Sequence, residues 1–307
     1  MKKTISLLLC AVMLLGLLGC TTAEPAVTTE ATQVPQTNAP TTIKTLKVLA
    51  IGNSFSVDAM EHLYTIAQAE GVEQIVLGNL YIAGCPLDKH AKNANTGEAA
   101  YKYYKNTLGV WEMKPVNVSL LEGLQDEQWD IITMQQSSPN SGLTDTYDPH
   151  LETLVAFVNE NKTNPDAKLF WHMTWAYQSD STHKPFANYG NDQNSMYLGI
   201  VNALQQKVES TGYFEKTLPV GTAIQNARTS FVGDTLTRDG FHLSDLGRVI
   251  AAYTWYAVMD GQPLYAVNID RAGALNLTDG HKQVIVEAVN AAIENPYKAT
   301  NSKNLLP

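Results

Sequence analysis

Beyond residue 44 the chain alternates between short apolar runs and longer segments in which apolar residues recur every three or four positions. Short apolar runs bounded by polar residues are typical of buried strands, and the three-to-four spacing indicates helices with one buried face. Strands that alternate with helices favour a parallel sheet covered on both faces. The expected strands span residues 46–51, 74–81, 129–134, 168–173 and 218–223, and the expected helices span 58–70, 88–106, 149–161, 192–210, 244–259 and 279–294. We therefore predict one α/β domain over residues 45–296 and a C-terminal tail over 297–307.

The N-terminus has the features of a secretion signal. Two lysines precede an apolar run over residues 5–18, which is shorter than the roughly 20 residues that a membrane-spanning helix needs. The sequence Leu17-Leu18-Gly19-Cys20 resembles the lipobox of bacterial lipoproteins, in which the cysteine is acylated and becomes the new N-terminus. The resemblance implies that residues 1–19 are removed and that Cys20 anchors a secreted protein to the outer face of a bacterial membrane. The alternative is a plain signal peptide with an incidental cysteine.

Residues 20–44 differ in composition from the rest of the chain. They are rich in Thr, Ala and Pro and lack apolar periodicity. Such a segment cannot bury enough apolar surface to fold. We therefore expect a lipidated cysteine followed by a disordered tether that holds the folded domain away from the membrane.

Composition narrows the range of partners. Of 307 residues, 44% are hydrophobic and 17% are charged, which indicates a folded chain. Lys and Arg number 21 against 30 Asp and Glu, a net charge of -9 that argues against a nucleic-acid binder. The three cysteines lack zinc-binding spacing, so we expect no structural metal site.

The first expected strand runs directly into Gly52-Asn53-Ser54-Phe55-Ser56, and a helix begins close behind it. Ligands bind beyond the carboxyl ends of the strands in a parallel sheet, so this junction is a candidate site. At a helix N-terminus, Ser54 would have backbone N–H groups nearby that can stabilise an oxyanion. The alternative is that Ser54 or Ser56 only caps the helix.

A serine hydroxyl needs a neighbouring base before it can act as a nucleophile. Two of the seven histidines follow an aspartate by three residues, as Asp180 with His183 and Asp239 with His242. The first pair lies in a long polar stretch and is expected to be a solvated loop. The second pair directly precedes an amphipathic helix that would hold it in place. We therefore favour His242 as the base and Asp239 as its orienting carboxylate.

Three separate motifs together resemble the SGNH/GDSL hydrolase superfamily from about residue 45 to residue 260. They are the Gly52–Ser56 motif in a G-N-S-F-S variant, Gly84 after the second strand, and Asp239-Gly240-Phe241-His242-Leu243. The resemblance implies a flavodoxin-like, three-layer α/β/α sandwich with a central parallel sheet of about five strands. It also implies that Ser54 is the nucleophile, that Asp239 and His242 supply acid and base, and that the Gly84 N–H is a second oxyanion-hole donor.

One part of the family pattern is missing. After the third strand the family has G-x-N-D, whose asparagine donates to the oxyanion, whereas this chain has Gln135-Gln136-Ser137-Ser138. A glutamine amide can donate the same hydrogen bond from one methylene further away. We therefore expect Gln135, or as second choice Gln136, to complete the oxyanion hole. The alternative is that both glutamines only tie down a loop.

Four other residues near strand ends are candidates for substrate binding. Asn53 precedes the candidate nucleophile, and His172 ends the fourth strand, although a buried core histidine is the commoner role. Trp175 and Tyr177 follow on the next loop and are expected to form an aromatic surface for a sugar ring, with core packing as the alternative.

These observations predict an extracellular serine esterase that acts without a metal or cofactor. Its expected substrate is a small-molecule or polysaccharide ester, and the resemblance favours removal of O-acetyl groups from a carbohydrate. The alternatives are a non-catalytic glycan-binding lipoprotein on the same fold and a thioesterase or lipase. The sequence leaves the acyl group, the sugar and the oligomeric state open.

Overall fold

The computed structural model describes residues 37–269 and 275–306. The predicted signal peptide, Cys20 and most of the predicted tether lie outside the described residues. No helix within the described ranges is long and apolar enough to cross a bilayer.

A seven-stranded sheet with the order β4-β3-β2-β1-β5-β6-β7 forms the centre of the fold. Its strands are β1 (Thr45–Gly52), β2 (Gln74–Tyr81), β3 (Lys102–Asn106), β4 (Trp111–Met113), β5 (Ile131–Met134), β6 (Lys168–His172) and β7 (Lys216–Leu218). Strands β2, β1, β5, β6 and β7 are parallel, and β3 and β4 add an antiparallel edge beside β2. The predicted parallel sheet of about five strands is therefore confirmed, and its order is that of flavodoxin-like folds.

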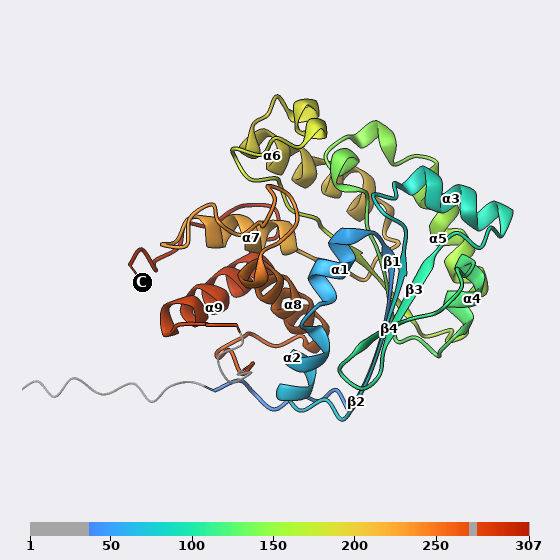
Figure 1. Cartoon of the computed structure of the whole chain (residues 1–307), viewed down its shortest axis with the longest axis horizontal. Helices are drawn as coiled ribbons and strands as arrows, with labels where there is room; N and C mark the ends of the chain where they lie inside the picture. Colours follow the sequence, from blue (N-terminus) through green and yellow to red (C-terminus); the bar gives the residue numbers. More distant parts are fainter. Residues whose placement is uncertain (1–36, 270–274, 307) are drawn as a thin grey trace, which may run out of the picture. The chain divides into compact units, whose positions relative to one another are not determined.

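Helices cover both faces of this sheet and give the predicted three layers (Figure 1). On one face lie α1 (Ser54–Met60), α2 (Leu63–Ala69), α7 (Val220–Arg228), α8 (Asp245–Asp260) and α9 (Asp279–Glu294). On the other face lie α3 (Leu87–Thr96), α4 (Leu120–Gln125) and α5 (His150–Asn161). Helix α6 (Gln193–Ala203) continues through a wider turn at Leu204–Val208 and forms the crossover from β6 to β7. Short 3-10 turns lie at Ser138–Asn140, Thr144–Thr146, Lys184–Tyr189 and Glu209–Thr211.

The core follows from the apolar strand sequences. Residues 48–51 of β1 are at most 1% exposed because helices cover both faces of this central strand. The buried aromatic side chains of Trp129 and Trp255 add to the packing of the two layers. The carboxyl ends of the parallel strands therefore sit on a rigid base.

Two predicted elements are wrong in part. The helix expected over 88–106 ends at Thr96, because Gly97 adopts φ of 67° and closes α3, and residues 102–106 form β3 instead. The strand expected over 218–223 ends at Leu218, and residues 220–228 form α7. In both places the local sequence fits either a strand or a helix, and only tertiary packing decides between them.

The expected helix over 58–70 is also divided. It begins earlier, at Ser54, and breaks into α1 and α2 between Met60 and Leu63. Helix α4 and strand β4 have no counterpart among the sequence predictions, since both are too short for a periodic pattern to show.

The described end of the predicted tether lies against the domain. The Asn38 side chain donates to Glu70 and to the main-chain carbonyl of Ala266, and the Thr41 hydroxyl donates to Asp260 at 2.6 Å. Residues 38–41 are therefore part of the folded unit.

The predicted C-terminal tail also contacts the domain. The Thr300 N–H donates to the Asn226 side chain at 2.6 Å, and the Phe231 N–H donates to the carbonyl of Asn304 at 2.9 Å. The tail therefore crosses α7 and the loop that follows it.

Candidate active site

Ser54 lies at the junction of β1 and α1, as the sequence predicts. Asn53 is the N-cap of α1, and its Oδ1 accepts a hydrogen bond from the Phe55 N–H at 3.0 Å. Ser54 is the first residue of the helix, where a backbone N–H has no partner within the helix. The Ser56 hydroxyl is buried and donates to the Asn53 carbonyl at 2.7 Å, so Ser56 takes the structural role.

Gly52 is required by close packing just before this turn. A Cβ atom at Gly52 would lie 2.6 Å from Ser56 Oγ and 2.9 Å from Gln135 Oε1. Neither neighbour is free to move, because both are buried and hydrogen-bonded. A side chain at position 52 would therefore displace the turn that presents Ser54.

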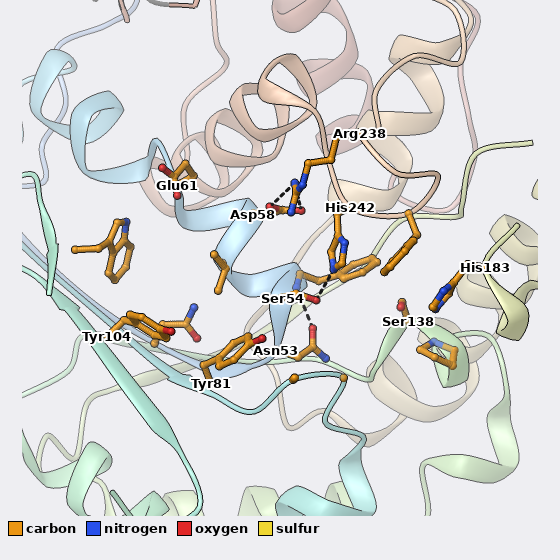
Figure 2. Close-up of a pocket in the computed structure, with 18 residues that line it drawn as sticks. Asn53, Ser54, Asp58, Glu61, Tyr81, Tyr104, Ser138, His183, Arg238 and His242 are labelled. Carbon is orange, nitrogen blue, oxygen red and sulfur yellow. Dashed lines mark hydrogen bonds and ion pairs between the residues drawn. The ribbon is translucent and has the colours of Figure 1, made fainter. Parts of the chain in front are cut away.

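The structure brings Ser54, His242 and Asp239 together in one hydrogen-bonded chain. The Ser54 hydroxyl lies 2.8 Å from His242 Nε2 (Figure 2). His242 Nδ1 lies 2.7 Å from Asp239 Oδ2. The pairing with the carboxylate places the imidazole proton on Nδ1 and leaves Nε2 free to accept the serine proton. The two stretches of sequence, 188 residues apart, thus meet in the geometry that a general base needs.

The Asp239 carboxylate is held in its ionised form. Its Oδ1 accepts the backbone N–H groups of Phe241 at 3.2 Å and His242 at 2.8 Å. Partial burial acts to raise the pKa of Asp239, but the hydrogen bonds from the His242 side chain and from the two backbone N–H groups outweigh it and lower the pKa below its ordinary value. A permanent negative charge therefore faces His242 Nδ1.

A buried aspartate that the sequence analysis missed connects α1 to the histidine loop. Asp58 is 1% exposed, lies one turn after Ser54 and pairs with Arg238 at 3.0 Å and Arg248 at 2.9 Å. Its Oδ2 also accepts the Leu243 N–H at 2.8 Å. The sequence around position 58 indicates only the start of a helix. The ion pairs of Asp58 could not be predicted from it, because both arginines come from a distant part of the chain.

Ser54 opens onto a cavity of about 620 Å³. Asn53 and Gly84 also line it, and Gly84 has φ of 57°, a left-handed conformation that favours glycine. Gly84, which follows β2, therefore lies at the same cavity as the serine, as predicted.

The two glutamines lie elsewhere. Gln135 is 2% exposed and is absent from the cavity lining; its Nε2 donates to Asn53 Oδ1 at 3.0 Å. Gln136 Oε1 accepts the Leu87 N–H at 3.1 Å, and its Nε2 donates to Thr146. The expectation that either amide points at the oxyanion is therefore contradicted by this geometry. The glutamine side chain is one methylene longer than that of asparagine, and the Gln135 amide contacts Asn53 instead of the cavity.

Three predicted substrate contacts are core residues. His172 is buried, its Nδ1 lies 3.1 Å from Gln135 Oε1, and burial lowers its pKa to about 3. Trp175 stacks on Phe55 with ring centroids 4.1 Å apart, and Tyr177 is fully buried. None of the three lines the cavity, because the loop after β6 turns inward under the site.

Other side chains that line the cavity were not predicted as a site. His183, assigned to a solvated loop, stacks on Phe241 with ring centroids 3.9 Å apart. Burial, together with the nearby His242, lowers the pKa of His183 below its ordinary value. At the other side of Ser54 the lining contains Tyr81, Tyr104, Trp111 and Glu61. Figure 2 shows Tyr81 and Tyr104 on one side of Ser54, and Ser138 and His183 on the other.

A metal ion bound by a protein needs several ligand side chains that converge on one point. Within residues 37–269 and 275–306, no group of three or more His, Cys, Asp or Glu side chains is arranged to hold a metal ion. The groups that meet at the cavity wall are the Ser54 hydroxyl and the His242 imidazole, with the Asp239 carboxylate behind the imidazole.

Comparison with known proteins gives the family. The model of the DUF4886 domain, a domain of unknown function, matches residues 47–271. A DUF4886 family protein from Bacteroides uniformis is 38% identical, with a TM-score of 0.80 over 85% of this chain and 100% of that one.

More distant structures share the fold only. A protein from Slackia heliotrinireducens proposed to be an SGNH hydrolase is 21% identical, with a TM-score of 0.48 over 70% of this chain and 99% of that one. A catalytic mutant of an acetylxylan esterase from Geobacillus stearothermophilus is 13% identical, with a TM-score of 0.45 over 74% and 97%. No curated protein matches the sequence. On the match over residues 47–271, the chain belongs to the DUF4886 family.

Proposed function

We propose that the protein is an extracellular serine esterase that removes O-acetyl groups from a carbohydrate through an acyl-enzyme on Ser54. The observation that carries the proposal is the continuous hydrogen-bonded chain from Ser54 through His242 to Asp239 at the wall of an open cavity. A serine that merely capped the helix would need neither the imidazole nor the carboxylate. The order of the motifs along the chain, which resembles that of SGNH hydrolases, supports the same reading.

In the first half of the reaction, Ser54 Oγ attacks the ester carbonyl carbon while its proton passes to His242 Nε2. Asp239 stabilises the imidazolium that forms and keeps the ring in its orientation. The ester C–O bond then breaks, the leaving alcohol takes the proton from Nε2, and the acyl group remains on Ser54.

Water completes the cycle. A water molecule takes the place of the alcohol, gives its proton to His242 Nε2 and attacks the acyl carbon. The carboxylic acid leaves, and the proton returns to Ser54 Oγ. Atoms and charges balance without a metal or a cofactor.

The oxyanion hole is proposed to use the Ser54 N–H, the Gly84 N–H and the side-chain amide of Asn53. Phe55 N–H and Gln135 Nε2 both donate to Asn53 Oδ1, which fixes the orientation of the amide. Asn53 lines the cavity and its Nδ2 donates to the Cys85 carbonyl at 3.3 Å, so the second Nδ2 hydrogen is the one assigned to the oxyanion. Gln135 is then a positioning residue that holds the Asn53 amide. Asn53, and not Gln135, takes the role that the asparagine of G-x-N-D has in the family pattern.

The decisive experiment is hydrolysis of 4-nitrophenyl acetate by the purified protein and by its Ser54→Ala variant. We expect turnover by the wild type and a loss of at least about a thousandfold in the variant. Ser210→Ala, at an exposed serine in the short turn Glu209–Thr211, is the matched control and should retain full activity. Equal rates in wild type and Ser54→Ala, or no rate in either, would remove the esterase proposal.

Esters with acyl chains of different length distinguish the esterase from a lipase, a thioesterase and a non-catalytic binding protein. Acetyl esters should be hydrolysed faster than esters or thioesters of long acyl chains. A preference for long chains would indicate a lipase or thioesterase. Binding of oligosaccharides without hydrolysis of any ester would indicate the non-catalytic glycan-binding protein.

Membrane anchoring is a second part of the proposal. Its support is the Leu17-Leu18-Gly19-Cys20 sequence alone, since this segment lies outside the described residues. Metabolic labelling with a fatty acid in a bacterial host should label the wild-type chain and leave Cys20→Ser unlabelled. Equal labelling of both chains, or of neither, would contradict an anchor at Cys20.

A further inference from the structure

The aromatic side of the cavity is built by strand register. Asn79 of β2 is paired with Tyr104 of β3, and Asn106 of β3 is paired with Trp111 of β4. Paired residues share a face of the sheet, as do residues two apart on one strand. Asn79, Tyr81, Tyr104 and Trp111 therefore lie on a single face, and all four line the cavity that contains Ser54. We call Tyr81, Tyr104 and Trp111 the aromatic wall.

The wall is accessible because of where the sheet extends. Strands β3 and β4 continue the sheet beyond β2 as an antiparallel edge. The helices on this face lie over the parallel strands (Figure 1). Helix α1 ends at Met60, and the next residue, Glu61, lines the cavity. Each of the three rings is partly exposed, unlike the fully buried Trp175 and Tyr177. Partly exposed aromatic faces beside a reactive group are typical of a binding surface.

The wall also carries polar groups. Neither Tyr81 Oη nor Tyr104 Oη has a hydrogen-bond partner within the described ranges, so both are available to a ligand. The rings of Tyr81 and Tyr104 meet edge to face, with centroids 5.9 Å apart and an interplanar angle of 79°. Burial, with the neighbouring Tyr104, raises the pKa of Tyr81, which keeps its hydroxyl as a donor at neutral pH.

Charge limits what can bind there. Asp58 is neutralised by two arginines, whereas Glu61, exposed at the end of α1, has no ion-pair partner in the part of the chain that the structure describes. Figure 2 shows Glu61 and the Asp58–Arg238 pair on the helix side of the cavity, across from Tyr104. Among the lining residues, Arg238 is the one Lys or Arg, and it is engaged by Asp58. An anionic ligand would therefore meet an uncompensated carboxylate.

We infer that the aromatic wall and Glu61 form a subsite for an uncharged sugar ring, which carries the acetyl ester to Ser54. This inference rests on the proposed esterase function and names the alcohol half of its substrate. A sugar ring presents C–H groups on its faces and hydroxyls on its rim, which match aromatic faces bordered by phenol, amide and carboxylate groups. An acetyl group is too small to need three aromatic side chains, so the wall takes the larger half of the ester.

The kinetic test compares two acetyl esters of different size. For Trp111→Ala and for Tyr104→Ala, kcat/KM for a peracetylated neutral disaccharide should fall about tenfold more than kcat/KM for ethyl acetate, which is too small to reach the wall. The fall in kcat/KM should come from a higher KM. Tyr213→Ala, on an exposed surface outside the cavity, is the matched control and should leave the ratio unchanged. An equal fall for both esters in the wall variants would overturn the subsite.

Binding measured without catalysis separates this inference from the esterase proposal. Ser54→Ala protein should bind the acetylated disaccharide in calorimetry, and Ser54→Ala combined with Trp111→Ala should bind it at least about tenfold more weakly. No hydrolysis of any ester by the wild type, with disaccharide binding retained, would sink the esterase proposal and leave the sugar subsite intact. Hydrolysis of 4-nitrophenyl acetate without any disaccharide binding would overturn the sugar subsite and leave the esterase proposal intact.

Ligand charge gives a second readout. The wild type should prefer an acetylated neutral sugar over an acetylated uronic acid, and Glu61→Gln should narrow that preference because the carboxylate repels the uronate. Acetylcholine serves as the cationic probe, since aromatic faces next to a carboxylate also suit a quaternary ammonium group. A kcat/KM for acetylcholine above that for the neutral sugar ester would overturn the assignment to a sugar.

Discussion

The Asn53 side chain, next to Ser54, has three hydrogen-bond partners. Its Oδ1 accepts from Phe55 N–H and from Gln135 Nε2, and its Nδ2 donates to the Cys85 carbonyl. The same residue caps α1 and, in the proposed mechanism, donates from Nδ2 to the oxyanion.

Replacing Asn53 by Asp separates those roles. The Asn53→Asp variant keeps an acceptor for the Phe55 N–H but removes the Nδ2 donor and adds a negative charge where the oxyanion forms. We expect kcat to fall about 10²- to 10³-fold with KM changed little. Asn202→Asp, an exposed position on α6, is the control. Wild-type kcat in Asn53→Asp would show that Asn53 is not an oxyanion donor.

The pH dependence of stability tests the Asp239 carboxylate. Its pKa is lowered in the folded state from an ordinary value of 3.8, so its bonds stabilise the fold above that value and the contribution is lost as pH falls through the lowered pKa. The difference in unfolding free energy between wild type and Asp239→Asn should be constant from about pH 5 to 7 and shrink below about pH 4. Urea unfolding across that range measures it. A difference that grows on acidification would contradict the lowered pKa.

At the scale of elements, Asp58 joins α1 to α8 and to the loop that carries Asp239 and His242. The Asp58→Asn variant removes the carboxylate that Arg238 and Arg248 share, although Arg248 keeps a longer contact of 3.6 Å with Asp245. We expect the free energy of unfolding to fall by about 2–4 kcal/mol. The loss is moderate because the aspartate is buried while the arginines are partly exposed to solvent.

The same change should lower kcat, because the His242 loop loses its attachment to the helix of Ser54. Urea unfolding and acetate-ester kinetics measure the two effects together. Asp88→Asn, an exposed acid in the first turn of α3, is the matched control. An unaltered kcat in Asp58→Asn would show that the loop is positioned without this contact.

Elements with strong local signals could be predicted from the sequence. Strand β2 and helix α9 have the predicted limits, because an apolar run with clear polar flanks and a capped amphipathic segment are each unambiguous. Residues 102–106 were misread because Tyr-rich sequence fits a strand only once β2 is there to pair with it. Helix α7 was missed because its buried residues follow directly on the short strand β7.

At the scale of the whole molecule, the meeting of Ser54 and His242 could be predicted from the sequence, whereas the lining of the cavity could not. Ser54 and His242 belong to motifs that carry their own local context, a strand-to-helix turn and a capped helix. Tyr104 and Trp111 enter the cavity only through pairing of β3 with its neighbours, which no local pattern shows. Trp175 was misassigned because a loop residue next to a strand end can point outward or inward, and packing decides which.

The C-terminal segment contributes to stability from outside the site. Removing residues 297–307 deletes the bonds from Thr300 and Asn304 to the α7 region, and from Ser302 to Glu287. At about 1 kcal/mol for each hydrogen bond, we expect the truncated chain to lose about 2–4 kcal/mol of unfolding free energy, with KM for ethyl acetate unchanged. Removing only residues 306 and 307 is the control. An unchanged urea midpoint in the longer truncation would show that the segment is not part of the cooperative fold.

The activation of Ser54 by His242 is tested most directly by covalent labelling. The purified protein is treated with a fluorophosphonate, which reacts with activated serine hydroxyls, and the modified peptide is identified by mass spectrometry. The account predicts a single adduct on Ser54 that forms rapidly in the wild type and is abolished in His242→Ala. An adduct on another residue, or equal labelling of Ser54 in the two proteins, would contradict it.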